Sequence, residues 1–208
     1  MLTTEICLSF FGIAALLALA PGPDNLFVLM QSAMWGPRAG LCVVLGLCTG
    51  LVGHTLAVAV GLAAVFAASP TAFTVLKLAG AAYLAYLAWG AFRAHGQMMK
   101  GEKLPRRTGG ELYRRGIIMN LTNPKVSLFF LAFLPQFTSP ERGSVALQTM
   151  YLGLLFMLAA LLVFGCIAFF SGAFGALLQR SVRAQKILNR AAGVVFLGLA
   201  LKLAFMHR

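Results

Sequence analysis

Acidic residues are scarce in this chain, which has five Asp and Glu against 17 Lys and Arg among its 208 residues. Charged residues make up 11% of the sequence, whereas an ordinary soluble domain carries roughly 25%. Hydrophobic residues make up 60%, and the mean hydropathy is +0.87. A soluble fold of this size could not bury so much apolar surface, so the composition excludes disorder, a coiled coil and a water-soluble globule. We therefore expect the lipid bilayer to surround the chain.

The sequence motifs of soluble enzymes are also missing. The chain has no phosphate-binding G-x-x-x-x-G-K-S/T, no H-E-x-x-H and no G-x-S-x-G. Its four cysteines lie in apolar stretches, without a C-x-x-C pair or a histidine at ligand spacing, which is typical of small apolar residues. With so few acids, no carboxylate pair is left for hydrolysis. We expect no enzyme activity, no metal site and no cofactor.

Long apolar runs are what the sequence has in abundance. A spanning helix needs about 20 consecutive apolar residues, and most of the six runs exceed that length. An all-α integral membrane protein with six transmembrane helices is the predicted fold class. The runs cover roughly 6–34, 39–67, 71–92, 116–137, 146–177 and 188–206.

The excess of cations predicts the orientation of these spans. A net charge of +12 would suggest nucleic acid in a soluble protein, but short cytoplasmic loops of membrane proteins also collect Lys and Arg. Twelve of the 17 cations lie in or beside the loops that follow the first, third and fifth runs. We therefore expect these loops in the cytoplasm, both termini outside, and no nucleic-acid partner.

The basic, glycine-containing segment 95–111 divides the chain into a first half, 1–94, and a second half, 112–208. Each half holds three runs, and an odd number inserts the second half upside down relative to the first. Both halves carry a proline in their first run, Pro23 and Pro124, followed by a similar apolar sequence. Prolines at corresponding places are typical of inverted repeats in transporters. We expect helices one and four to be broken there.

Both breaks are expected near the middle of the membrane. Asp24 precedes Gly36 by twelve residues, which is about 18 Å of helix. Lys125 follows Arg115 by ten residues, or about 15 Å. The hydrocarbon core is roughly 30 Å thick, so the two estimates place both charged residues at mid-depth.

The residues at the breaks favour an anion site. Asn123 and Pro124 suit the cap and first position of a new helix, and Gly22 with Pro23 can act alike. Each new helix would point its positive end at the membrane centre, where a substrate carboxylate could bind.

Asp24 is well placed beside the positive end of its own helix, but Lys125 is not. A charge at mid-membrane costs at least ~2.5–3.5 kcal/mol, so the Lys125 ammonium needs a partner. Asp24 and a bound substrate carboxylate are the two candidates. A structural Asp24–Lys125 ion pair is the alternative to a transport role.

Other polar residues near the breaks leave two interpretations each. Asn25 and Asn120 could contact substrate or hold helices together by hydrogen bonds. His54 could relay protons or be a satisfied core histidine. Gly46 and Gly50 form a G-x-x-x-G face that could pack within one subunit or between subunits of a homo-oligomer.

Three motifs resemble a known family. They are Pro-Gly-Pro-Asp at 21–24, Lys-x-x-Gly-Ala-x-Tyr-Leu at 77–84, and Asn-Leu-x-Asn-Pro-Lys followed by Phe-Leu-Pro-Gln-Phe within 120–137. In this order, over essentially the whole chain, they resemble the LysE/RhtB family of amino-acid exporters. The first and last motifs together are specific. The resemblance implies a bacterial inner-membrane exporter of an amino acid or close derivative, driven by the electrochemical gradient.

The resemblance and the residues lead to one hypothesis. The helix ends and Lys125 hold the substrate carboxylate, while Asp24 holds its ammonium group or exchanges a proton for it. An exporter of metal or inorganic ions is the runner-up, and a membrane enzyme or scaffold comes third. The predicted substrate-binding residues are Gly22, Pro23, Asp24, Asn25, Asn120, Asn123, Pro124 and Lys125.

Overall fold

The computed structural model describes residues 2–20, 22–68, 70–94, 106–171 and 182–205. Helices make up nearly all of this part of the chain, and no strand occurs in it. The long α-helices are α1 (Thr4–Leu19), α2 (Pro23–Trp35), α3 (Pro37–Ala68), α4 (Pro70–Arg93), α5 (Gly109–Leu121), α7 (Val145–Phe169) and α9 (Val182–Phe205). The short elements are α6 (Pro124–Leu128), η1 (Phe129–Phe133), η2 (Leu134–Phe137) and η3 (Pro140–Arg142).

The two expected helix breaks are confirmed. α1 and α2 are bent by 63° around Gly22, and α5 is bent by 47° from the segment Pro124–Phe137. A proline cannot donate a backbone hydrogen bond and clashes with the preceding turn. A new helix therefore begins at Pro23 and another at Pro124. Asn123 caps its restart as expected, because its side-chain oxygen accepts from the Lys125 backbone N–H at 3.0 Å.

The helix after the second break is irregular in a way that the sequence did not predict. α6 lasts five residues and continues as a π-helix over Phe129–Phe133 and a 3-10 turn over Leu134–Phe137. The π-helical phenylalanines pack against one another and against α1 and α7. Ring centroids of Phe129 lie 5.1 Å from Phe133 and 5.1 Å from Phe156, and Phe10 lies 5.2 Å from Phe137. This cluster is a buried aromatic core on one side of the break.

Close packing of small residues joins the two halves. A Cβ added to Gly46 of α3 would meet the Tyr113 carbonyl oxygen and come within 3.0 Å of the Gly116 Cα in α5. A Cβ added to Gly50 would lie 2.7 Å from the side chain of Asn120. The G-x-x-x-G face therefore packs within the subunit, against α5. Of its two interpretations, packing within one subunit is the one that the structure supports.

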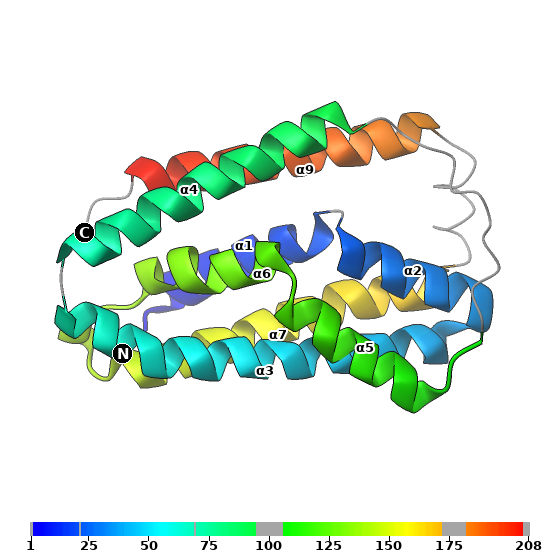
Figure 1. Cartoon of the computed structure of the whole chain (residues 1–208), viewed down its shortest axis with the longest axis horizontal. Coiled ribbons are helices and arrows are strands. Elements are labelled where there is room, and N and C mark those ends of the chain that lie inside the picture. Colours follow the sequence, from blue (N-terminus) through cyan, green and yellow to red (C-terminus); the bar gives the residue numbers. More distant parts are fainter. Residues whose placement is uncertain (1, 21, 69, 95–105, 172–181, 206–208) are drawn as a thin grey trace.

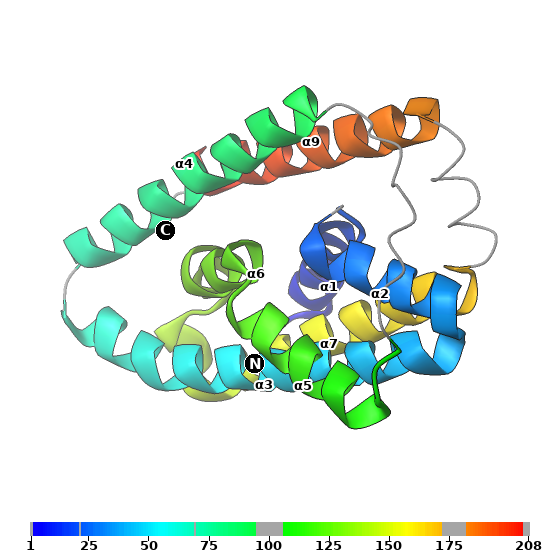
Figure 2. The same ribbon diagram turned by 45° about the vertical axis from the view of Figure 1, so that its right-hand side comes forward.

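Two layers of helices are visible in Figure 1 and, after a 45° turn, in Figure 2: α4 and α9 lie side by side along one flank of the remaining helices. Gly80 of α4 approaches this remaining group, since a Cβ there would meet Ala132 of η1. α2 and α6 leave the central breaks toward opposite ends of the molecule (Figure 1).

The helices suit a bilayer. Three of them are long and apolar enough to cross it, over Pro37–Gly61, Val145–Phe169 and Gln185–Phe205, and the two bent pairs raise the total to five. Large apolar side chains are exposed on them, among them Val60 at 77% and Leu154 at 59%. The molecule is thus a multi-pass helical membrane protein with three to five candidate spans. The predicted span 71–92 corresponds to α4, which is outside these five.

Helix starts also precede the apolar runs, at α9, which begins at Val182 ahead of the run 188–206, and at α5. α5 begins at Gly109, within the segment 95–111 predicted as a linker and ahead of the apolar run at 116. The Thr108 side chain accepts from Glu111 N–H, and Glu111 accepts from Thr108 N–H at 2.8 Å. This capping box starts the helix in a polar sequence that hydropathy alone would leave as a loop. Residues 95–105 of the predicted linker lie outside the described residues.

Candidate functional site

Lys125 lies at the crossing of the two broken helices. Its side chain is 7% exposed, and its ammonium group donates to the carbonyl oxygens of Leu17 at 3.1 Å and Ala20 at 3.0 Å. These carbonyls belong to the last turn and the C-cap of α1, where helix geometry leaves them without backbone partners. A cation is favourable at this negative end of a helix. The sequence had offered only Asp24 and a bound carboxylate as partners for Lys125, and the α1 carbonyls form a third.

The Asp24 carboxylate is held by a hydrogen bond from the Asn123 side chain. The Asp24 side chain is 1% exposed, and its Oδ2 accepts from Asn123 Nδ2 at 2.8 Å. Its Oδ1 has no hydrogen-bond partner among the described residues, so no hydrogen bond joins it to Lys125 there. Asn123 therefore connects the two charged residues, because its other side-chain atom accepts from the Lys125 backbone.

Asn25 joins α2 to α1 through its side chain, Asn120 contacts α3 through its backbone, and each keeps one unpartnered side-chain oxygen among the described residues. Asn25 Nδ2 donates to the Ala18 carbonyl oxygen at 2.6 Å, which satisfies another group at the end of α1. The backbone carbonyl oxygen of Asn120 accepts from His54 Nε2 at 3.2 Å. The Oδ1 atoms of both asparagines have no partner in the described part of the chain.

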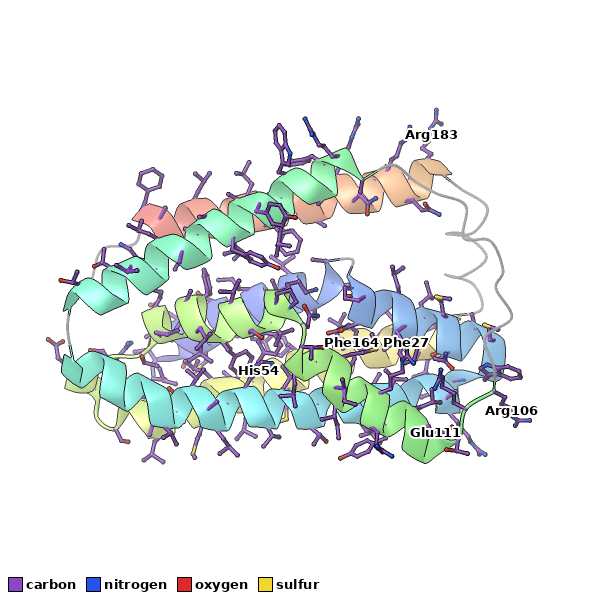
Figure 3. All side chains as sticks on the ribbon, in the orientation of Figure 1. Phe27, His54, Arg106, Glu111, Phe164 and Arg183 are labelled. Atoms are coloured by element: carbon purple, nitrogen blue, oxygen red, sulfur yellow. The ribbon has the colours of Figure 1, made fainter. Side chains whose placement is uncertain are left out.

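His54, labelled in Figure 3, also stacks on Phe130, with ring centroids 5.5 Å apart. It is part-buried between α3 and the second break. Its backbone hydrogen bond and ring contact are those of a satisfied core histidine, although it touches the Asn120 that was predicted to bind substrate.

Two spaces adjoin this arrangement, and Lys125 lines both. A cavity of about 10 Å³, close to what one water molecule needs, lies on the buried side beside Asp24. Phe164, labelled in Figure 3, is also part of its wall. A groove of about 400 Å³ lies on the other side, toward α4 and α9. The cavity is lined by Leu17, Ala18, Asp24, Leu51, Asn120, Lys125, Val126, Phe156 and Phe164.

The groove divides the predicted site. Five of the eight predicted residues line it, two others line the cavity with Lys125, and Asn25 lines neither space. The five are Gly22, Pro23, Asn123, Pro124 and Lys125. Gly22 lies close to the ammonium, since a Cβ there would be 3.4 Å from Lys125 Nζ.

Sequence reasoning missed the wall that α4 and α9 contribute. Tyr83 and Tyr86 of α4 and Asn189 of α9 line the groove opposite the breaks. The two tyrosine rings lie 5.9 Å apart. The two tyrosines, one turn apart in an apolar helix, could have indicated a polar wall. The sequence does not tell which helix faces the breaks, so it could not place them in the site.

The Lys125 ammonium brings positive charge to the wall of this groove. An ammonium group has three N–H donors, and two are used on α1 carbonyls among the described residues. One donor therefore remains on a side chain that lines the groove, and the nearby start of α2 adds a positive helix end. Within the described residues, no group of three or more His, Cys, Asp or Glu could hold a metal ion.

Comparison with known proteins gives consistent matches. A family model described as LysE type translocator matches residues 15–207. The homoserine/homoserine lactone efflux protein of Salmonella typhimurium is 33% identical over 196 residues, 94% of each chain. An uncharacterized membrane protein of Vibrio cholerae is 31% identical and covers 96% of this chain and 97% of its own. One of Bacillus subtilis is 29% identical and covers 94% and 96%. No solved structure matches the chain.

Proposed function

Because the chain belongs to the LysE type translocator family, we propose that it exports a small amino acid or close derivative from the cytoplasm in exchange for protons. A relative that is 33% identical over most of both chains is named for homoserine and homoserine lactone efflux. These two compounds are therefore the first substrates to test.

The proposed arrangement in the bacterial inner membrane has six spans, in two inverted halves of three, 1–94 and 112–208, joined by the cytoplasmic linker 95–111. The two bent pairs, one in each half, support it. Arg106 and Arg183 lie at one end of the molecule (Figure 3), and the start of α1 and the end of α9 lie at the other (Figure 1). Both termini are then outside, and α4 is the sixth span. A homo-oligomer would have to use a surface other than the Gly46 face.

Lys125 carries the proposal. Its buried ammonium lines a groove of about 400 Å³, is tied to α1 by two hydrogen bonds and keeps one donor for a ligand. A substrate carboxylate binds that donor, with Gly22 leaving room beside the ammonium and Asn123 on the same groove wall. Tyr83, Tyr86 and Asn189 face the rest of the substrate.

Asp24 is the proposed proton-exchanging group. Its carboxylate is held by Asn123, close to the substrate-binding ammonium but behind it. One proton moving inward across 100 mV supplies ~2.3 kcal/mol. A tenfold gradient costs ~1.4 kcal/mol, so one proton supports export of a zwitterion against a gradient of about fiftyfold.

The test is efflux from proteoliposomes or cells loaded with labelled homoserine and a labelled amino-acid mixture, with and without an uncoupler. Wild type should export, and the uncoupler should stop concentrative export. Asp24→Asn should lose the response to a pH gradient while remaining in the membrane. Lys125→Met should lose affinity, whereas the matched control Lys202→Met, an exposed lysine on α9, should behave as wild type.

Equal loss of label from wild type and empty vesicles would refute amino-acid export and favour the alternative, export of a metal or inorganic ion. Unchanged coupling in Asp24→Asn would refute the proton role alone.

A further inference from the structure

The buried face of α2 carries a line of polar side chains. Asp24, Gln31 and Ser32 are spaced seven and eight residues apart, which puts them on one side of a helix. All three are buried, with exposures of 1%, 0% and 2%. They run from the break toward the end of α2 at Trp35, over which the Arg106 guanidinium lies at 5.7 Å.

Four polar atoms of this line are unpartnered in the described part of the chain. They are Asp24 Oδ1, both side-chain polar atoms of Gln31, and Ser32 Oγ. Buried polar groups in native proteins are paired with protein or with ordered water, because leaving them unpaired is costly. Four such atoms on one helix face point to a hydrated route.

The corresponding positions of the other broken helix are different. Seven and eight residues after Lys125 come Ala132 and Phe133, which are 2% and 0% exposed within the phenylalanine cluster. Phe133 stacks on Phe129 at 5.1 Å. α2 and α6 run to opposite ends of the molecule (Figure 1), so the polar line and the aromatic core lie on opposite sides of the breaks.

The polar line is also separate from the groove. Neither Gln31 nor Ser32 lines the groove, and Asp24 lines the small cavity behind Lys125 instead. The polar line and the groove are therefore different surfaces, and among the described residues only Lys125 lines both the groove and the cavity.

We infer that Gln31 and Ser32 line a proton route, distinct from the substrate groove, that connects Asp24 with the end of the molecule at Arg106. This rests on the proposed proton exchange. When the O–H bond of protonated Asp24 breaks, the proton passes to water and leaves the carboxylate. The amide and hydroxyl both donate and accept hydrogen bonds, so they can order a water chain. Lys125 and, through Asn120, His54 are the titratable side chains facing this end of the route.

Thiol labelling tests the route without depending on transport. In a variant whose four cysteines are replaced, Ser32→Cys and Ala132→Cys are matched, because both native residues are 2% exposed. A charged, membrane-impermeant thiol reagent applied from the Arg106 side should modify Ser32→Cys about tenfold faster or more, the ratio that a barrier difference of ~1.4 kcal/mol gives. Equal protection of the two thiols would overturn the inference.

Proton flux provides the second measurement. In liposomes, Gln31→Leu should slow homoserine-driven proton flux about tenfold, while exchange of labelled for unlabelled homoserine, which needs no net proton movement, continues. Exchange in the variant also reports that it is folded. A homoserine-driven proton flux in Gln31→Leu equal to that of wild type would overturn the proposed route. Absence of homoserine exchange in wild type would instead count against the proposed function, and the labelling would then decide the route.

Discussion

The contact between α3 and α5 can be tested with two glycine substitutions in the same helix. Gly46 and Gly61 both lie in α3, but their surroundings are opposite. A Cβ at Gly46 would meet the Tyr113 carbonyl oxygen and lie 3.0 Å from the Gly116 Cα, whereas a Cβ at Gly61 would have nothing within 4 Å. The atoms facing Gly46 are backbone, so they cannot rotate away.

The expected free-energy changes differ in sign. Overpacking costs about 1–3 kcal/mol. Alanine in a helix gains roughly 0.5–1 kcal/mol over glycine. Because Gly46 faces backbone atoms, its overpacking cost belongs in the upper part of that range, about 2–3 kcal/mol, and Gly46→Ala should destabilise by the difference, about 1–2.5 kcal/mol. Gly61→Ala keeps only the gain of roughly 0.5–1 kcal/mol.

Thermal unfolding of the purified protein in detergent, followed by the fluorescence of Trp35 and Trp89, measures the difference. For a chain of this size, 1 kcal/mol shifts Tm by about 2–4 °C, so Gly46→Ala should melt about 2–10 °C below wild type. Gly61→Ala should melt slightly above it. A Gly46→Ala protein that melts at or above the wild-type temperature would refute the close contact with α5.

Three further substitutions test the site and its surroundings. Lys125→Met removes the charged donor, worth ~1.5–3 kcal/mol, and should weaken homoserine binding about 10- to 150-fold by calorimetry; affinity equal to wild type would contradict the carboxylate role. Asn25→Ala leaves the Ala18 carbonyl unpaired and should lower stability by about 1–3 kcal/mol in the same melting assay, with an unchanged Tm as the opposing result. Thr108→Ala removes a helix cap worth about 1 kcal/mol and should lower Tm without changing efflux, so lost efflux in the folded variant would contradict a purely structural role.

The places of both helix breaks were predictable because their causes are local. Proline lacks a backbone donor wherever it stands, and Asn123 caps the residue two positions later through its own side chain. The π-helix over Phe129–Phe133 was not predictable, since its apolar residues fit an ordinary helix equally well. It occurs where phenylalanines pack against α1 and α7, which are distant in sequence.

The sequence predicted which charged residues belong to the candidate site, but not which groups they bind. Intramembrane Asp24 and Lys125 stand out in any apolar sequence because uncompensated charge is costly there. That the ammonium binds Leu17 and Ala20, more than 100 residues away, depends on how the halves cross. The same holds for Tyr83 and the rest of the α4–α9 wall.

By itself, the sequence determined that this protein is embedded in a bilayer and that new helices begin at Pro23 and Pro124. It also determined that one acidic and one basic residue lie next to the breaks. These follow from composition and from interactions within a few residues. Only the tertiary structure decided that Asn123 stands between those charges, that the Gly46 face is used within the subunit, and that groove and cavity lie on different sides of Lys125. Such contacts join atoms from separate helices, and no local rule specifies them.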